Sequence, residues 1–146
     1  MQPGDQVLLN DHRRNAAWSG AYTHEEGYLL GLLIGDGTLA GERAVLSVWP
    51  GEAVAGGDVA RPGVAGVMRA AENAARGMAR RNDFKGWNAV AGRGECRMRL
   101  AGLSELAVSF GVKAGHKTIT AAMERTSSDF HRGLLRGLFD ADGSVQ

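Results

Sequence analysis

The chain has 146 residues, a net charge of +1, 44% hydrophobic residues and 23% charged residues, a composition typical of one globular domain with its own core. It contains no apolar run of the roughly 20 residues that cross a bilayer, and its polar N-terminus does not predict a signal peptide. Cys96 is the single cysteine, which excludes an intrachain disulfide. We therefore expect a cytoplasmic protein with no membrane partner.

The first predicted helix follows a polar stretch, residues 1–24, that shows no clear periodicity. Thr23 is a suitable N-cap for this helix. Glu25 and Glu26 would lie in its first turn, where acids interact favourably with the helix dipole. From Tyr28 onward, large apolar residues recur at helical spacing, which supports a helix in this part of the chain.

The centre of the chain alternates between predicted strands and helices. A hairpin is expected over residues 38–49 and a loop over 51–63, followed by the clearest amphipathic helix of the chain at 64–81. Two strands joined by a glycine-containing turn are expected within 86–100. A short helix, closed by a glycine, is expected at 103–111.

The second of these two strands has one apolar face and one charged face. Its side chains alternate in the period-2 pattern of a half-buried strand, with Cys96, Met98 and Leu100 on one face and Glu95, Arg97 and Arg99 on the other. Residues 61–99 as a whole hold nine Lys or Arg against three acids. This basic block favours an anionic partner, although a solvated helix face is an equally good explanation for part of it.

Two segments of the chain repeat one another. Residues 29–37 read LLGLLIGDG and residues 135–143 read LRGLFDADG, so each is an apolar, glycine-spaced stretch that ends in Asp-Gly. The two final acids, Asp36 and Asp142, are 106 positions apart, a separation suited to one structural repeat. An isolated Asp-Gly is usually only a turn. Its duplication in the same register favours a functional role.

Small residues recur every four positions in both segments, at Gly31, Gly35, Gly133, Gly137 and Ala141. Glycine costs about 1 kcal/mol relative to alanine in a helix interior, so an ordinary core helix would avoid it. A helix that meets another at close backbone contact has a use for such a face. We therefore expect the two segments to be helices that pack against each other, the second one capped by Ser127 or Ser128.

Each repeat would carry its acid in the last turn of a helix, where it faces the negative end of the helix dipole. Two such ends side by side bring together two carboxylates, which repel each other unless a cation lies between them. Mg²⁺ takes oxygen ligands, and one or two carboxylates together with substrate phosphate oxygens suit it. Asp36 and Asp142 are therefore the predicted ligands of a Mg²⁺ ion that would serve phosphodiester hydrolysis.

The two segments resemble the duplicated LAGLIDADG, or dodecapeptide (DOD-type), motif of homing endonucleases. The second copy carries Arg136 at the small second position and Phe139 at the isoleucine. The first copy has Ile34 at the earlier aspartate and Gly35 at the alanine. The final acid, which the family uses for metal binding, is present in both copies. The resemblance covers roughly residues 25–146.

The resemblance implies an α+β fold, in which an αββαββα repeat carries a saddle-shaped antiparallel sheet that lies on DNA. The first repeat would span residues 25–127, and residues 128–146 would hold only the motif helix of a second repeat. Residues 1–24 would be a remnant and linker, because Pro3 to Leu9 resembles the PGD-V strand of intein splicing (Hint) domains. An intein origin is therefore expected, with a ribonucleotide reductase as one candidate host.

The activity that the resemblance implies is site-specific, Mg²⁺-dependent cleavage of double-stranded DNA, with Asp36, Asp142 and Lys117 as catalytic residues. Lys117 precedes the second motif, where the intein endonucleases that this chain resembles carry an active-site lysine; a solvated loop lysine is the alternative. Four residues of the basic block would contact the DNA: Lys85, Arg93, Arg97 and Arg99. Lys85 and Arg93 would bind phosphates, and Arg97 and Arg99 would bind phosphates or guanine edges.

The chain ends three residues after Gly143, before a second sheet could follow. We therefore expect a fragment with weak or no nuclease activity alone, unless it pairs with a second copy or with a C-terminal half. Similar domains also occur as free-standing nucleases, as intron maturases and as regulators that bind without cleaving, so a DNA-binding regulator is the alternative function. The target sequence does not follow from the fold, because the residues that specify it vary on a common sheet.

Overall fold

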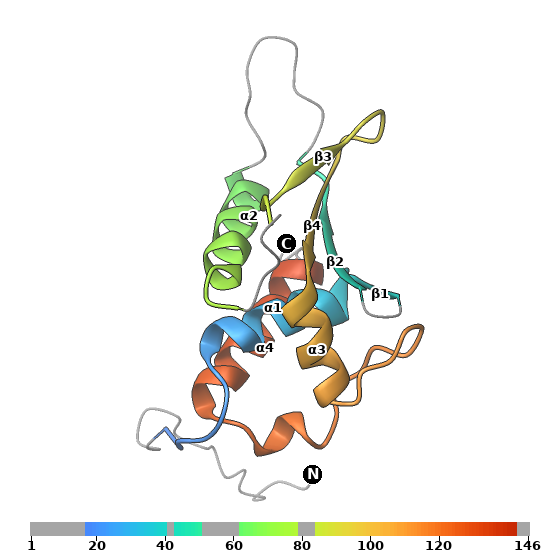
Figure 1. Cartoon of the computed structure of the whole chain (residues 1–146). Helices are drawn as coiled ribbons and strands as arrows, with labels where there is room; N and C mark the ends of the chain where they lie inside the picture. The colour runs from blue at the N-terminus through green and yellow to red at the C-terminus, as the bar shows by residue number, and fades with distance from the viewer. Residues whose placement is uncertain (1–16, 41–42, 51–61, 79–83, 143–146) are drawn as a thin grey trace, which may run out of the picture.

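The structure is a computed structural model that describes residues 17–40, 43–50, 62–78 and 84–142 (Figure 1). Within these residues, four helices, one 3₁₀ turn and one four-stranded sheet form a mixed α+β fold, as predicted. The elements in chain order are α1 (His24–Gly35), β1 (Thr38–Ala40), β2 (Arg43–Val48), α2 (Pro62–Ala75), β3 (Asn88–Val90), β4 (Glu95–Leu100), α3 (Ala101–Ser109), the 3₁₀ turn Met123–Arg125 and α4 (Ser128–Asp142).

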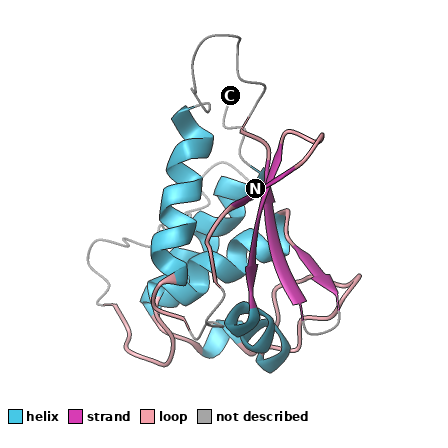
Figure 2. Cartoon of the chain, turned by 45° about the horizontal axis from the view of Figure 1, so that its top comes forward, coloured by secondary structure: helices cyan, strands magenta, loops and turns pink. Residues whose placement is uncertain are grey.

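The sheet has the strand order β1-β2-β4-β3, and every neighbouring pair is antiparallel. Its two central strands pair with Leu46 opposite Met98 and Val45 opposite Arg99. Leu46 and Met98 are buried, whereas Arg99 on the other face is exposed. The predicted alternation of β4 is therefore confirmed from Met98 to Leu100, whereas at the start of the strand Glu95 is buried and Cys96 only half-buried. Figure 2 shows the strands along one side of the molecule, so the helices leave one face of the sheet uncovered, which we call the open face. Because Leu46 and Met98 point into the core, Arg99 lies on this open face.

The core lies between the sheet and the helices, with α1 at its centre. This helix contacts α4, α2, α3 and β2, and Leu29, Leu30 and Leu33 are completely buried. Its start is the predicted one, because the Thr23 hydroxyl accepts a hydrogen bond from the amide of Glu26 (3.2 Å) while the Glu26 carboxylate accepts one from the amide of Thr23 (2.7 Å). This reciprocal capping box satisfies two amides that the helix cannot.

The two motif helices pack directly against each other, as their glycines predict. A Cβ atom added to Gly31 would lie 2.3 Å from the carbonyl oxygen of Leu134, and one added to Gly137 would lie 2.2 Å from that of Tyr28. Gly35 faces Ala141, whose Cβ would be 2.4 Å from an added Cβ. Real Cβ atoms do not approach so closely, so the separation of α1 and α4 depends on the missing side chains.

Both ends of the long amphipathic helix differ from the prediction. The helix expected at 64–81 is α2, which begins at Pro62 and ends at Ala75. Proline suits the first position of a helix, where the missing N–H has no partner in any case. At the other end, the amides of Gly77 and Met78 bond to carbonyls three residues back, which tightens and ends the helix. The expected loop at 51–63 otherwise lies outside the described residues.

The remaining predicted elements are confirmed. The hairpin expected over 38–49 is β1 and β2, and the strands expected within 86–100 are β3 and β4. The helix expected at 103–111 is α3, which starts two residues earlier, directly after β4. Gly111 follows it with φ +77°, and its amide bonds to the carbonyl of Val108, so the helix ends at this glycine. The 3₁₀ turn was not predicted.

Residues 17–23 lie against the start of α4. The amide of Trp18 donates to the Ser128 hydroxyl (2.9 Å), and its indole N–H donates to the carbonyl of Thr126 (2.7 Å). Ser127 is the residue that caps α4, because its hydroxyl accepts from the amide of Phe130 (3.1 Å). Most of the segment 1–24, including the strand resembling a splicing domain, lies outside the described residues.

The second motif helix differs from the first in what covers it. Leu135 and Phe139 occupy the positions of Leu29 and Leu33 in the repeated segment. Leu29 and Leu33 are completely buried, whereas Leu135 is 52% exposed and Phe139 is 68% exposed. We call these two side chains the Leu135/Phe139 face; Phe139 borders the cavity that Trp49 and Val67 also line, and both side chains remain mostly exposed. No helix among the described residues could span a membrane.

Candidate active site and nucleic-acid interface

The two predicted metal ligands lie at neighbouring helix ends. Asp36 is the residue that ends α1, and Asp142 is the last residue of α4. Both carboxylates are exposed, and both line one cavity of about 700 Å³ that also reaches Trp49 and Trp87. The structure therefore brings together two acids that are 106 positions apart in the sequence.

Lys117 lies at the same end of α1. Its ammonium donates to the carbonyl oxygens of Leu33 (3.1 Å), Gly35 (3.1 Å) and Gly37 (2.5 Å). Burial lowers the pKa of Lys117, and the charges of Asp36 and Asp142 oppose that shift by favouring the ammonium form. The lysine is therefore no solvated loop residue. It satisfies carbonyls that the end of a helix leaves without partners.

The groups at this site have the chemistry that Mg²⁺ requires. Asp36 and Asp142 offer hard oxygen ligands, and two carboxylates are a sufficient protein contribution when phosphate oxygens and water complete the shell. Among the described residues, no group of three or more His, Cys, Asp or Glu could hold a metal ion. A closed structural metal site would need more ligands from the protein.

A third aspartate near this site has a structural partner that the sequence did not reveal. Asp140 accepts a hydrogen bond from the Tyr28 hydroxyl (2.8 Å), and the Nε of Arg136 is 3.6 Å from the same carboxylate oxygen. The Arg136 guanidinium also lies 5.0 Å from the centre of the Tyr28 ring. Burial, followed by the bond to Asp140, raises the pKa of Tyr28. Asp140 therefore links α4 to α1.

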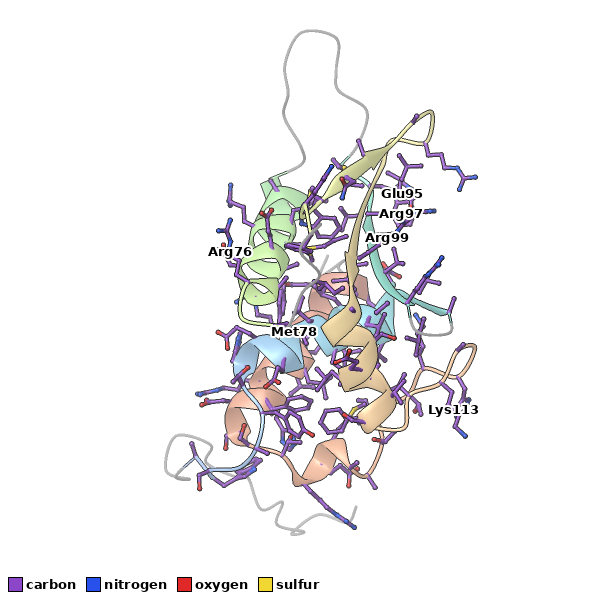
Figure 3. All side chains as sticks on the ribbon, viewed as in Figure 1. Arg76, Met78, Glu95, Arg97, Arg99 and Lys113 are labelled. Carbon is purple, nitrogen blue, oxygen red and sulfur yellow. The ribbon has the colours of Figure 1, made fainter. Side chains whose placement is uncertain are left out.

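The open face of the sheet brings together three of the four predicted DNA contacts. Lys85, Arg97 and Arg99 line one hollow of about 860 Å³, and Arg43 lines it too, although the sequence did not single it out. Arg93 is not part of this lining; it lies in the exposed turn between β3 and β4. Figure 3 shows Arg97 and Arg99 along β4 on the side away from α2.

Other residues of the basic block belong to a solvated helix face. Arg76 directly follows the last residue of α2 and lies beside this helix on the side away from the sheet (Figure 3), and its Nη2 is 3.5 Å from the carboxylate of Glu72 one turn earlier. Arg69 on the same helix is also exposed. The solvated-face explanation therefore holds for these two residues, whereas an anionic partner for the rest of the block stays a prediction. Arg61, Arg80 and Arg81 lie outside the described residues.

Glu95 is the least expected residue on the open face, because only 4% of it is exposed. Its Oε1 accepts from Nε of Arg97 (2.6 Å) and its Oε2 accepts from Nη2 of the same guanidinium (3.0 Å). These bonds, with a further one from Ser47, lower the pKa of Glu95 below its ordinary value. Nothing in the alternating sequence pattern distinguishes this acid from a solvated one.

Compared with known proteins, the chain matches no family model, no curated protein and no solved structure.

Proposed function

We propose that this chain is a site-specific endonuclease domain that hydrolyses double-stranded DNA with Mg²⁺, of the kind found in intein homing endonucleases. The observation that carries the proposal is the meeting of Asp36, Asp142 and Lys117 at one end of two glycine-packed helices. Acids at the negative ends of two helix dipoles serve no evident structural purpose, whereas a divalent cation would stabilise them.

The residues of the site have separable roles in this reaction. Asp36 and Asp142 would hold Mg²⁺, which when bound stabilises the charge that develops on phosphate and activates water. Lys117 holds the end of α1, and with it the backbone of residues 33–37, through its three carbonyl bonds. It also contributes a positive charge beside the two acids.

The open face of the sheet would receive the DNA. Arginine and lysine neutralise phosphates, and arginine also recognises guanine edges in the major groove. Arg43, Lys85, Arg97 and Arg99 line one hollow on the face of the sheet that the helices leave uncovered. The single cysteine agrees with a cytoplasmic location for such a protein.

A second structural unit is expected to cover the Leu135/Phe139 face. The matching leucines of α1 are buried beneath the sheet and α3 of the first repeat, so the repeated sequence predicts equivalent cover for α4. A C-terminal half or a second copy of the chain would supply it. Without that unit we expect cleavage that is weak but still dependent on Mg²⁺.

The alternative is a regulator that binds DNA without cleaving it. It is favoured by the three carbonyl bonds of Lys117, which give this lysine a sufficient structural role.

Cleavage of long duplex DNA of random sequence, with Mg²⁺ and with excess chelator, separates the two functions. We expect Mg²⁺-dependent products that disappear in Asp36→Asn and in Asp142→Asn. Asp129→Asn is the matched control, because Asp129 lies in the first turn of α4, at the opposite end from the site. Salt-sensitive binding with no cleavage, unchanged in both site variants, would favour the regulator. Cleavage that persists in both site variants would contradict the assigned ligands.

A further inference from the structure

Glu95 and Arg97 form an ion pair in the first half of β4, on the open face of the sheet. They are two positions apart on β4, so both side chains leave the strand on the same side. The carboxylate binds the guanidinium through two roughly parallel hydrogen bonds of 2.6 and 3.0 Å. Ser47, which lies opposite Arg97 on β2, supports the same carboxylate. The guanidinium plane is therefore held from one side.

The bonds to Glu95 leave a defined part of Arg97 available. A guanidinium has five N–H donors, and Glu95 takes the one on Nε and one of the two on Nη2. The remaining donors are the two on Nη1 and the second on Nη2. The outer edge therefore keeps two parallel N–H groups, the arrangement that forms bidentate bonds to an acceptor pair.

Stability alone does not account for this pair. Moving a carboxylate out of water is costly, and an ion pair that compensates for that cost is often no better than apolar residues of the same size. Glu95 is 4% exposed on the face that the helices leave open, whereas Arg97 keeps a side-chain exposure of 35%. The arrangement covers the acid and presents the arginine to solvent.

We infer that Glu95 is a positioning residue that holds Arg97 to read one guanine in the DNA, so that Arg97 contributes base specificity while Arg99 binds a phosphate. This inference rests on the proposed function. Guanine presents O6 and N7 as two neighbouring acceptors in the major groove, which match the free outer edge of Arg97. A phosphate can also accept a bidentate pair, but it presents oxygens in several directions, so a fixed guanidinium adds less to phosphate binding than to reading a base.

Arg99 is the natural comparison on the same strand and the same face. It is exposed, lies opposite Val45, and forms no ion pair with any residue that the structure describes. Its guanidinium is free to follow a phosphate. Replacing it should weaken binding to all sequences to a similar degree and make binding less dependent on salt.

Selection of bound duplexes from a random-sequence pool, performed with the full chain, tests the inference. We expect the selected sequences to share one guanine, and Glu95→Gln to reduce the preference at that position roughly 5- to 150-fold while the other positions keep theirs. Arg97→Lys keeps the positive charge but loses the two parallel N–H groups, so it should reduce the preference at the same position. Arg99→Gln should lower retention of all sequences without changing any preference.

Failure of the inference and failure of the proposed function give different results. If the unaltered chain retains no duplex at low salt, the proposed function fails and the inference with it. If it selects a preferred sequence that Glu95→Gln and Arg97→Lys leave unchanged, or weaken evenly at all positions, the inference alone is overturned. Thermal unfolding of each variant shows whether an even loss reflects a damaged fold, which would lower binding to all sequences alike.

Discussion

The ammonium of Lys117 donates to the carbonyl oxygen of Gly37 over 2.5 Å, although the two residues are 80 positions apart in the sequence. With the bonds to Leu33 and Gly35, this contact closes the C-terminal end of α1 beside Asp36. The loop after α3 is therefore tied to the helix that carries one of the two site acids. The position of Asp36 depends on a residue distant in sequence.

Loss of this contact should destabilise the fold. We expect Lys117→Met to lower the free energy of unfolding by about 1–3 kcal/mol, because it leaves helix-end carbonyls without a donor. Urea denaturation followed by circular dichroism measures the change. Lys113→Met is the control, since Lys113 is exposed on the same loop (Figure 3). Equal stability of both variants would contradict the role assigned to the three bonds.

A larger side chain at the contact between the two motif helices should not be tolerated. Gly31→Ala would put a Cβ 2.3 Å from the carbonyl oxygen of Leu134, so the helices must separate, at a cost of about 1–3 kcal/mol or more. Gly66→Ala in α2 has no atom within 4 Å of the added Cβ and should be neutral or stabilising by up to about 1 kcal/mol. The melting temperature of Gly31→Ala should therefore fall, whereas that of Gly66→Ala should stay the same or rise.

Because of the ion pair between Glu95 and Arg97, we expect the stability of the fold to decrease as the pH falls into the acid range. Because the hydrogen bonds from Arg97 lower the folded-state pKa of Glu95 below 4.5, the folded chain holds the proton less tightly than the unfolded chain. The stabilisation is complete above about pH 4.5 and is lost as the pH falls through the folded-state pKa. Glu95→Gln should therefore be less stable than the unaltered chain at pH 7, with a smaller difference near pH 3.

Glu105→Gln is the control for this titration, because Glu105 is an exposed residue of α3. Its stability relative to the unaltered chain should change little between the two pH values. A difference for Glu95→Gln that stays constant with pH would show that the carboxylate makes no charge-dependent contribution to stability.

The two phenylalanines of α4 should respond very differently to substitution. Phe130 is completely buried, and Phe130→Ala should cost about 3–5 kcal/mol. Phe139 is 68% exposed, so Phe139→Glu should change the free energy of unfolding by no more than about 0.5 kcal/mol. Chemical denaturation of the chain by itself compares them. A large loss for Phe139→Glu would show that residues of this chain cover the Leu135/Phe139 face.

Local patterns predicted most of the elements. The Thr23 cap, the period-2 alternation of β4 from Met98 to Leu100 and the glycine after α3 each act within a few residues, so sequence periodicity and propensity were sufficient. The predicted end of α2 was wrong because the apolar stripe continues to Met78, whereas the amide of Gly77 already bonds to a carbonyl three residues back and ends the helix. The apolar pattern does not report that change in hydrogen bonding.

The sequence by itself determined the alternation of helices and strands, the two glycine-spaced motifs and the pairing of their helices, because each depends on spacing along the chain. Only the tertiary structure decided which polar groups meet. It joined Lys117 to the end of α1, linked Asp140 to Tyr28, and covered Glu95 beneath Arg97 on an otherwise open face. Such contacts follow from the docking of distant segments, and the same residue types without that docking would be ordinary solvated side chains.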